Sequence, residues 1–319
     1  MKTVNFGIMG PGTIAHKFAN ACTFVDTVNV VAVASTKLER ATTFASEFGI
    51  EKAYGNYADL LADENVDAVY ISVINSVHLE LITLAAKAGK AILCEKPSVV
   101  NQEEADKLAA ILEETNVLFM EGMWTLHLPA VVKAKEWIAQ NRIGQLKSIQ
   151  SSFSFWVDKS NGGRLFEKEL WGGGLLDVGV YCIAFSNFMA NNMPTQIKAM
   201  EMMGDTGVDE YGTVMLRYPN NIIATGYYGV TLRRPDDGYT FGDSGYIKFD
   251  DFWNCSTISL YDDNHTCLDT FTAPHENGFM YEIAHFANLY LNDKKESDVN
   301  TIANTMNYIS IFEQVRAQR

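Results

Sequence analysis

The chain has 319 residues, enough for about two domains that each bury a core without a metal ion or a disulfide. Its formal net charge of −14 argues against nucleic acid as a partner, because the phosphate backbone is bound mainly through clustered Lys and Arg. The five cysteines are scattered, no secretory leader is recognised, and no apolar run approaches the length of a membrane span, so we expect a cytoplasmic protein without a membrane partner.

A strand is predicted over residues 3–9, and a glycine-rich turn follows it at once and opens a helix. This is the pattern G-x-G-x-x-A in its strand-turn-helix context, which favours dinucleotide binding because the glycines let a pyrophosphate approach backbone N–H groups. An ordinary tight turn is the alternative. The candidate cofactor residues of this turn are Gly10, Pro11, Gly12, Thr13 and Ile14.

The second predicted strand, Val28 to Ala34, ends where the adenosine ribose of a dinucleotide would lie. An acidic residue at this place would bind the 2′-hydroxyl. The chain has hydroxyls and cations there, which suit a 2′-phosphate and predict NADP(H) in preference to NAD(H). Alternatively the cations only solvate a helix start, with Glu39 diluting their charge. The residues concerned are Ser35, Thr36, Lys37 and Arg40.

Two further strands end in polar residues. After residues 66–73 come Asn75 and His78, which could hydrogen-bond the cofactor or simply cap a helix. After residues 91–94 comes Glu95-Lys96-Pro97, where the proline restricts Lys96 to extended conformations and makes a cis bond accessible. A lysine at the carboxyl end of a parallel strand is placed for chemistry, although a surface turn is the alternative. Strands and helices alternate through residues 1–121, which predicts a doubly wound parallel sheet.

The pattern changes over residues 122–319. Strands are predicted at 147–157, 196–203, 212–218, 222–230, 245–249 and 257–261, with helices at 129–140, 278–291 and 301–319. They indicate an α+β domain with a largely antiparallel sheet covered on one face, and the uncovered face predicts a homodimer. Between the first two strands, a glycine triplet precedes Asp177 and Tyr181, whose spacing puts them on one helix face. A hydrogen bond without chemistry is the alternative for this pair. The six histidines form no ligand-spaced cluster, so we expect no metal.

These motifs together resemble the family of glucose-fructose oxidoreductase, inositol dehydrogenase and MocA-type proteins. The likeness runs from end to end and is carried by residues 7–15, Asn75 with His78, Glu95-Lys96-Pro97, residues 172–181 and residues 278–282. Tyr181, where many members have His, is similar to the branch of glucose-fructose oxidoreductase and dimeric dihydrodiol dehydrogenase. The chain departs from that branch at Leu126-His127, where Arg-Phe is usual.

The resemblance implies a Rossmann domain, a sheet domain that dimerises, and reversible hydride transfer between NADP(H) and a carbinol carbon. It implies Lys96, Asp177 and Tyr181 as catalytic residues, and Gly7, Glu95 and Lys96 as further cofactor residues. A tyrosine normally titrates near 10, and a cationic lysine beside it would lower its pKa towards neutrality. Four aromatic residues could line the substrate pocket or merely pack in the core: Trp124, Phe155, Trp253 and Phe279.

Three functions therefore stay open. The first is an NADP(H)-dependent oxidoreductase of sugars, polyols or related hydroxy compounds. The second is a trans-dihydrodiol dehydrogenase, which would use the same residues on a more apolar ring. The third is a nicotinamide-binding sensor without enzymatic activity, since fold does not decide function.

Overall fold

The computed structural model describes residues 2–319 and contains two compact units. The first unit comprises residues up to Trp124 together with Asn277–Met306, and the second comprises Thr125–Glu276 together with Asn307–Arg319. The first crossing lies close to the predicted boundary at 121/122. The prediction that everything after residue 122 forms the second domain differs from the structure, because the chain returns to the first unit at Asn277.

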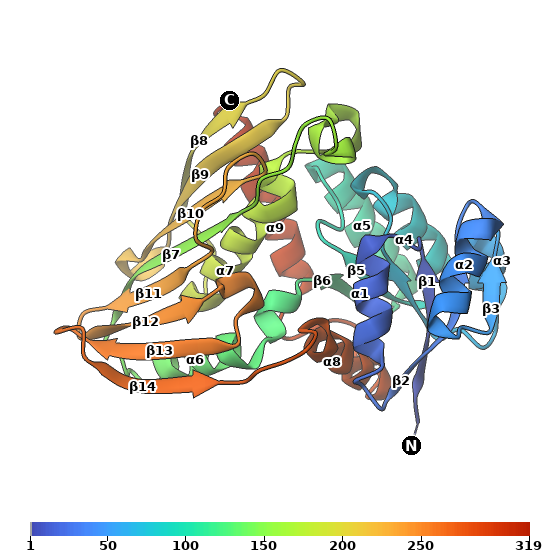
Figure 1. The fold of residues 1–319 in the computed structure, drawn as a ribbon, viewed down its shortest axis with the longest axis horizontal. Coiled ribbons are helices and arrows are strands. Elements are labelled where there is room, and N and C mark those ends of the chain that lie inside the picture. Colours follow the sequence, from blue (N-terminus) through green and yellow to red (C-terminus); the bar gives the residue numbers. More distant parts are fainter. Residues whose placement is uncertain (1) are drawn as a thin grey trace. The chain divides into compact units, whose positions relative to one another are not determined.

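The first unit contains a six-stranded parallel sheet (Figure 1). Its order is β3-β2-β1-β4-β5-β6, and these strands span Lys52–Tyr54, Val28–Ala34, Val4–Met9, Ala68–Ile71, Ala91–Glu95 and Phe119–Gly122. The central strands are buried on both faces, which explains their nearly continuous apolar runs. The strand order reverses between β1 and β4, and in such sheets ligands bind at the carboxyl ends of the strands beside this point.

The helices of the first unit are α1 (Thr13–Cys22), α2 (Leu38–Phe48), α3 (Tyr57–Ala62), α4 (His78–Lys87), α5 (Gln102–Thr115) and α8 (Phe279–Leu291). Local chemistry sets several of their ends. The side chains of Asn56 and Asn101 accept the N–H groups of Asp59 and Glu104 and so cap α3 and α5, and Gly49 ends α2 in the left-handed conformation. The doubly wound parallel sheet is confirmed.

Helix α8 belongs to the first unit because its apolar face completes that unit's core. The ring of Phe286 lies 5.3 Å from that of Phe6 in β1. Just before the helix, the side chain of Asn277 donates to the backbone oxygen of Lys17 in α1. The sequence pattern indicates an amphipathic helix here but does not identify the surface that it covers.

The second unit contains an eight-stranded sheet of order β14-β13-β12-β11-β7-β10-β9-β8. The strands β7 to β14 span Leu146–Ser154, Gln196–Met203, Asp209–Arg217, Ile223–Gly229, Gly238–Gly242, Gly245–Asp250, Thr257–Asp262 and Cys267–Thr272. All neighbours are antiparallel except the parallel pair β7 and β10, so the prediction of a mostly antiparallel sheet is confirmed. Strands β11 and β14, like β3, were not predicted, because they are short and rich in Gly, Thr or charged residues.

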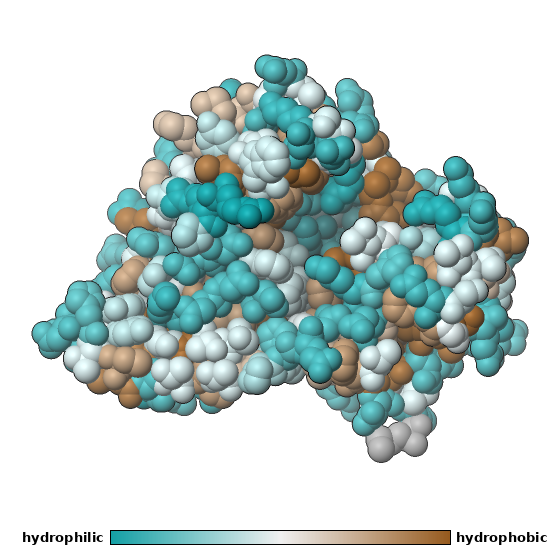
Figure 2. All heavy atoms as spheres, viewed as in Figure 1, coloured by the Kyte–Doolittle hydropathy of each residue, from teal (hydrophilic) through white to brown (hydrophobic). Residues whose placement is uncertain are grey.

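Helices cover one face of this sheet and leave the other open. Helix α7 (Val180–Ala190) packs on β7 and β10, and α6 (Pro129–Ala139) packs near β13 and β14. Helix α9 spans Ile302–Arg316, and its residues from Asn307 onward belong to this unit. Gly226 of β10 lies against Cys182 of α7, so its neighbours Thr225 and Tyr227 point to the open face. That face exposes Met200, Met215 and Ile223, and Figure 2 shows apolar tan spheres over β8 and β9.

One segment of the second unit, Lys168–Ala190, is long and apolar enough to cross a membrane by length and composition. This corrects the expectation that no run approaches such a length. In the structure 83% of its most apolar window is buried. Core packing of α7 therefore accounts for its apolar character.

Candidate active site

The glycine turn at the end of β1 forms a cradle for a pyrophosphate. Gly10 has φ +100°, and a side chain there would meet Val73 at 2.7 Å, so only glycine fits. At Gly12, by contrast, an added Cβ would meet nothing nearer than the Ser72 oxygen at 3.8 Å. No side chain caps the start of α1, which leaves the N–H groups of Thr13 and Ile14 available to an anion. These residues fit a dinucleotide.

Beside this turn, the end of β2 and the start of α2 line an open cavity of about 470 Å³. The cations of Lys37 and Arg40 both line it, together with Pro11 of the glycine turn. Arg40 donates to the backbone oxygen of Pro11 at 3.4 Å, which ties the two loops together. Glu39, Glu47 and His16 also line the cavity. Ser35 is buried and its hydroxyl accepts the N–H of Lys37, whereas Thr36 is exposed.

Asn75 and His78 follow β4, as predicted, and both are buried. The two ring nitrogens of His78 lie 2.9 Å from the Pro97 oxygen and 3.1 Å from the Val73 oxygen. The imidazole thus links the loops that follow β4 and β5. By joining these two loops, the His78 ring helps to position Lys96. Gly7 lies within β1, where Leu60 leaves no room for a side chain.

The segment Glu95-Lys96-Pro97 ends β5, and the Lys96–Pro97 peptide bond is cis. The buried Glu95 carboxylate accepts a hydrogen bond of 2.5 Å from the Tyr70 hydroxyl. Burial raises the pKa of Glu95, and the charge of Lys96 opposes that rise. Lys96 therefore directly follows a strand whose last residue, Glu95, is a buried acid.

Two more acids are buried in the first unit, and neither was a predicted site residue. Glu121 accepts the N–H of Ser98 and the hydroxyl of Thr305. Glu282 in α8 has no hydrogen-bond partner for either carboxyl oxygen among residues 2–319. Burial, and next the charge of Glu95, raise the pKa of Glu282 well above its usual range.

In the second unit, Asp177 lies in a π-helical turn, Leu175–Gly179, that leads directly into α7. Such turns are rare and are frequent at functional sites. The Asp177 carboxylate accepts a hydrogen bond of 2.9 Å from the Arg164 guanidinium, with which it forms an ion pair. Arg164 was not a predicted site residue, because only the tertiary structure brings its 3₁₀ turn, Gly163–Phe166, to the glycine triplet.

Tyr181 lies in the first turn of α7 and ends a row of aromatic rings. Its ring meets that of Phe153 edge-on at 5.2 Å, and Phe153 stacks on Trp253 at 4.5 Å. The Trp253 indole N–H donates to Asp236 at 3.1 Å. The row thus connects Tyr181 to the predicted Trp253 through Phe153, which was not a predicted site residue. The predicted Phe155 lies two residues further, beyond the end of β7.

The other two predicted aromatic residues lie in the first unit. Trp124 stacks on Phe279 with ring centroids 4.9 Å apart, and both side chains are buried. Within residues 2–319 there is no group of three or more His, Cys, Asp or Glu side chains that could hold a metal ion. Each unit therefore contributes predicted residues: the cofactor turn and Lys96 in the first, and Asp177 with Tyr181 in the second.

Two family models match this chain. The NAD-binding Rossmann fold of an oxidoreductase family matches residues 4–123, and the GFO/IDH/MocA C-terminal domain matches residues 131–248. Among curated proteins, trans-1,2-dihydrobenzene-1,2-diol dehydrogenase of Xenopus tropicalis is 31% identical over 98% of this chain and 97% of that protein. The enzyme of the same name from Mus musculus is also 31% identical, over 98% of this chain and 96% of its own length.

Solved structures have the same fold. Aldose-aldose oxidoreductase from Caulobacter crescentus, complexed with glycerol, superposes with a TM-score of 0.89 at 19% identity and covers 99% of this chain and 97% of its own. KijD10, a 3-ketoreductase from Actinomadura kijaniata in complex with NADP and TDP-benzene, has a TM-score of 0.88 at 24% identity and covers 99% and 98%.

Proposed function

This chain belongs to the Gfo/Idh/MocA family of NAD(P)-dependent oxidoreductases, and we propose that it is an NADP(H)-dependent dehydrogenase of a ring alcohol. The ring is that of a sugar or polyol, or that of a trans-dihydrodiol. The preference for NADP(H) is supported by the cavity that Lys37 and Arg40 line beside the glycine turn. Two cations there suit the 2′-phosphate that distinguishes NADP from NAD.

The residues of this chain supply the binding and the proton transfer. Bound nicotinamide supplies or accepts the hydride. When a carbinol is oxidised its hydroxyl proton must leave, and we assign the Tyr181 hydroxyl as the group that takes it. We assign Lys96 to the same step, as the family resemblance implies. Asp177 keeps its place through its ion pair with Arg164, so Arg164 acts as a positioning residue.

Two observations support the ring alcohol. The aromatic row that ends at Tyr181 offers apolar ring faces, which suit the flat face of a dihydrodiol or the C–H face of a sugar ring. Curated relatives that match over nearly the full length include dihydrodiol dehydrogenases, whereas one structural neighbour is an aldose-aldose oxidoreductase. A panel of sugars, polyols, dicarbonyls and trans-dihydrodiols, followed by nicotinamide absorbance, separates the two classes.

The cofactor preference is tested by calorimetric titration of NADPH and NADH. We expect NADPH to bind more tightly than NADH. Arg40→Ala should weaken the binding of NADPH by about tenfold, because one charge-assisted contact to phosphate is lost, and should leave the binding of NADH nearly unchanged. Lys107→Ala is a matched control, since Lys107 is an exposed lysine whose ion pair is with Glu103 in α5. Equal affinities for the two cofactors in the wild type would overturn the preference.

We also propose that the chain forms a homodimer through the open face of its sheet. The exposed Met200, Met215 and Ile223 support this, because soluble monomers seldom expose large apolar areas. Cytoplasmic location stays a prediction and is compatible with the five free cysteines.

A further inference from the structure

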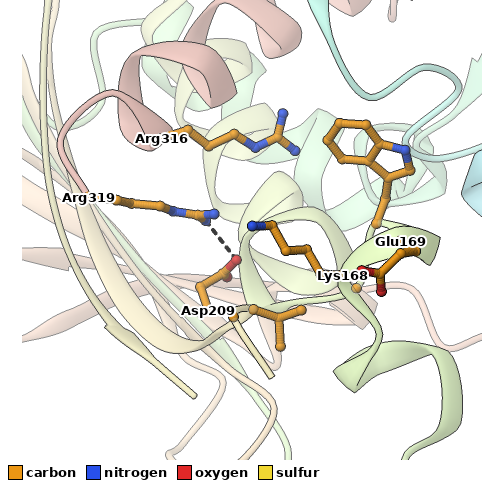
Figure 3. Close-up of a pocket in the computed structure, with 9 residues that line it drawn as sticks. Lys168, Glu169, Asp209, Arg316 and Arg319 are labelled. Atoms are coloured by element: carbon orange, nitrogen blue, oxygen red, sulfur yellow. Dashed lines mark hydrogen bonds and ion pairs between the residues drawn. The ribbon is translucent and has the colours of Figure 1, made fainter. Parts of the chain in front are cut away.

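The second unit contains a cavity that neither the cofactor nor the proton-transfer residues explain. Its volume is about 440 Å³, which is in the range of small-molecule sites. Three segments far apart in the sequence line it: residues 168–172, the β8–β9 connection with Asp209, and the last turn of the chain with Arg316 and Arg319 (Figure 3). The cavity lies entirely within this unit.

Three cations converge on this cavity, and they differ in how well their charges are compensated. Arg319 is fully engaged, since it donates to Glu201 at 2.7 and 3.1 Å and to Asp209 at 2.7 Å. Those two acids are mostly buried, and they share this one guanidinium. Arg319 and its partners therefore form the fixed wall of the cavity.

The other two cations are Arg316 and Lys168. The Arg316 side chain is 18% exposed and forms an ion pair of 3.3 Å with the half-exposed Glu313, and the charges of Asp209 and Glu201 also act on it. Burial lowers the pKa of Arg316, which means that its charge is poorly solvated. No acidic group among residues 2–319 lies within ion-pair distance of the Lys168 amino group. That amino group extends between Arg316 and Arg319 (Figure 3).

An aromatic ring completes the cavity. The Arg316 guanidinium lies over the Trp171 ring at 5.0 Å, which orients both groups. Trp171 has φ +57°, a conformation that bulky residues rarely adopt and that is concentrated at ligand sites. The following Gly172 leaves no room for a side chain, because a Cβ there would meet the Arg164 oxygen at 2.4 Å. Trp171 and Gly172 therefore belong to a tightly packed loop that forms one wall of the cavity.

We propose that this cavity binds the oxyanion of a small molecule, a phosphate or a carboxylate, with Lys168 and Arg316 as its cationic contacts and Trp171 as a side wall. An oxyanion provides the acidic partner that the Lys168 amino group lacks, and the guanidinium fork of Arg316 binds either group through two N–H donors. The proposal does not rest on the proposed function, because binding needs no turnover.

The test is calorimetric titration of the full chain with inorganic phosphate and with glucuronate, in chloride buffer of low ionic strength. We expect saturable binding of at least one probe in the millimolar range or tighter. Lys168→Ala should weaken it by about tenfold, since one charge-assisted contact is lost. Arg316→Gln should weaken it at least as much. Lys168 is exposed, so its replacement leaves the fold intact even if Arg316→Gln does not.

Two control variants locate the site. Lys147→Ala removes another exposed lysine of the same unit and should leave binding unchanged. Arg40→Ala should also leave it unchanged, because Arg40 lines the cofactor cavity. The proposal is overturned if neither probe binds saturably, if Lys168→Ala binds like the wild type, or if Arg40→Ala abolishes the binding.

A second measurement distinguishes the two sources of the oxyanion. If it is one end of the substrate, Lys168→Ala raises KM for an anionic sugar and leaves KM for a neutral one unchanged. If it is a separate effector, added phosphate changes the rate with a neutral substrate in the wild type and not in Lys168→Ala. Either pattern supports the site. Identical kinetics of wild type and Lys168→Ala under both conditions contradict a functional site.

Discussion

The substitution Gly12→Ala should separate cofactor binding from folding. Gly12 has φ −97° and ψ −176°, which alanine adopts readily. An added Cβ would lie 3.8 Å from the Ser72 oxygen, an ordinary contact. Alanine is a poorer N-cap than glycine by about 0.5–1 kcal/mol, and the lower entropy of the unfolded chain offsets this by about 0.4–1 kcal/mol. We therefore expect the free energy of unfolding to change by less than about 0.5 kcal/mol.

Cofactor binding should respond very differently. The methyl group that Gly12→Ala adds would lie where a pyrophosphate approaches the uncapped start of α1. Displacing the phosphate from two N–H donors removes hydrogen bonds to a charged group, each worth about 1.5–3 kcal/mol. A loss of at least about 3 kcal/mol corresponds to binding weakened by about 100-fold or more. Calorimetric titration of NADPH measures this, and urea unfolding without cofactor measures the stability.

Gly10→Ala is the matched comparison. Its φ of +100° and the 2.7 Å contact with Val73 add strain and overlap, so this variant should lose at least about 2 kcal/mol of stability as well as cofactor binding. The reasoning is refuted if Gly12→Ala binds NADPH within about threefold of the wild type. It is equally refuted if Gly12→Ala is destabilised as much as Gly10→Ala, since Gly12 would then be a folding residue.

Three further outcomes are expected. Tyr181→Phe should lower kcat by a factor of about 10² to 10⁴ with an identified substrate, and its double mutant with Lys96→Met should fall well short of the product of the two losses; near-full turnover of Tyr181→Phe would make the tyrosine structural. Met200→Glu, on the open sheet face, should shift the mass measured by light scattering towards the monomer, and an unchanged dimer would move the interface elsewhere. Burial, and then the charge of Glu201, raise the pKa of Asp209 to about 6, which is above its value in the unfolded chain. The folded state therefore binds this proton more tightly, and the stability that the proton contributes is lost as pH rises through about 6. Between about pH 5 and pH 7, urea unfolding should therefore show the wild type losing about 1 kcal/mol relative to Asp209→Asn, and a constant difference would contradict the raised pKa.

Much of the fold follows from local sequence. The strand-turn-helix pattern around Gly10 and Gly12 identifies the cofactor turn, and apolar runs ending in Ser35, Asn75 and Glu95 identify the carboxyl edge of a parallel sheet. These features depend on backbone conformation and on a period of two or of about 3.6 residues, which short windows of sequence contain. Family membership follows from the same motifs together.

Only the tertiary structure decides which distant side chains meet. Three features join segments whose local sequence patterns do not indicate that they meet. They are the ion pair of Arg164 with Asp177, the position of Phe153 between Tyr181 and Trp253, and the return of α8 to the first unit. The cavity that holds Lys168 is the clearest case, because its walls come from residues separated by more than a hundred positions. Periodicity specifies which face of a helix or strand is buried. The free energy of burial depends little on which apolar partner covers that face, so the packing of the whole unit determines the partner.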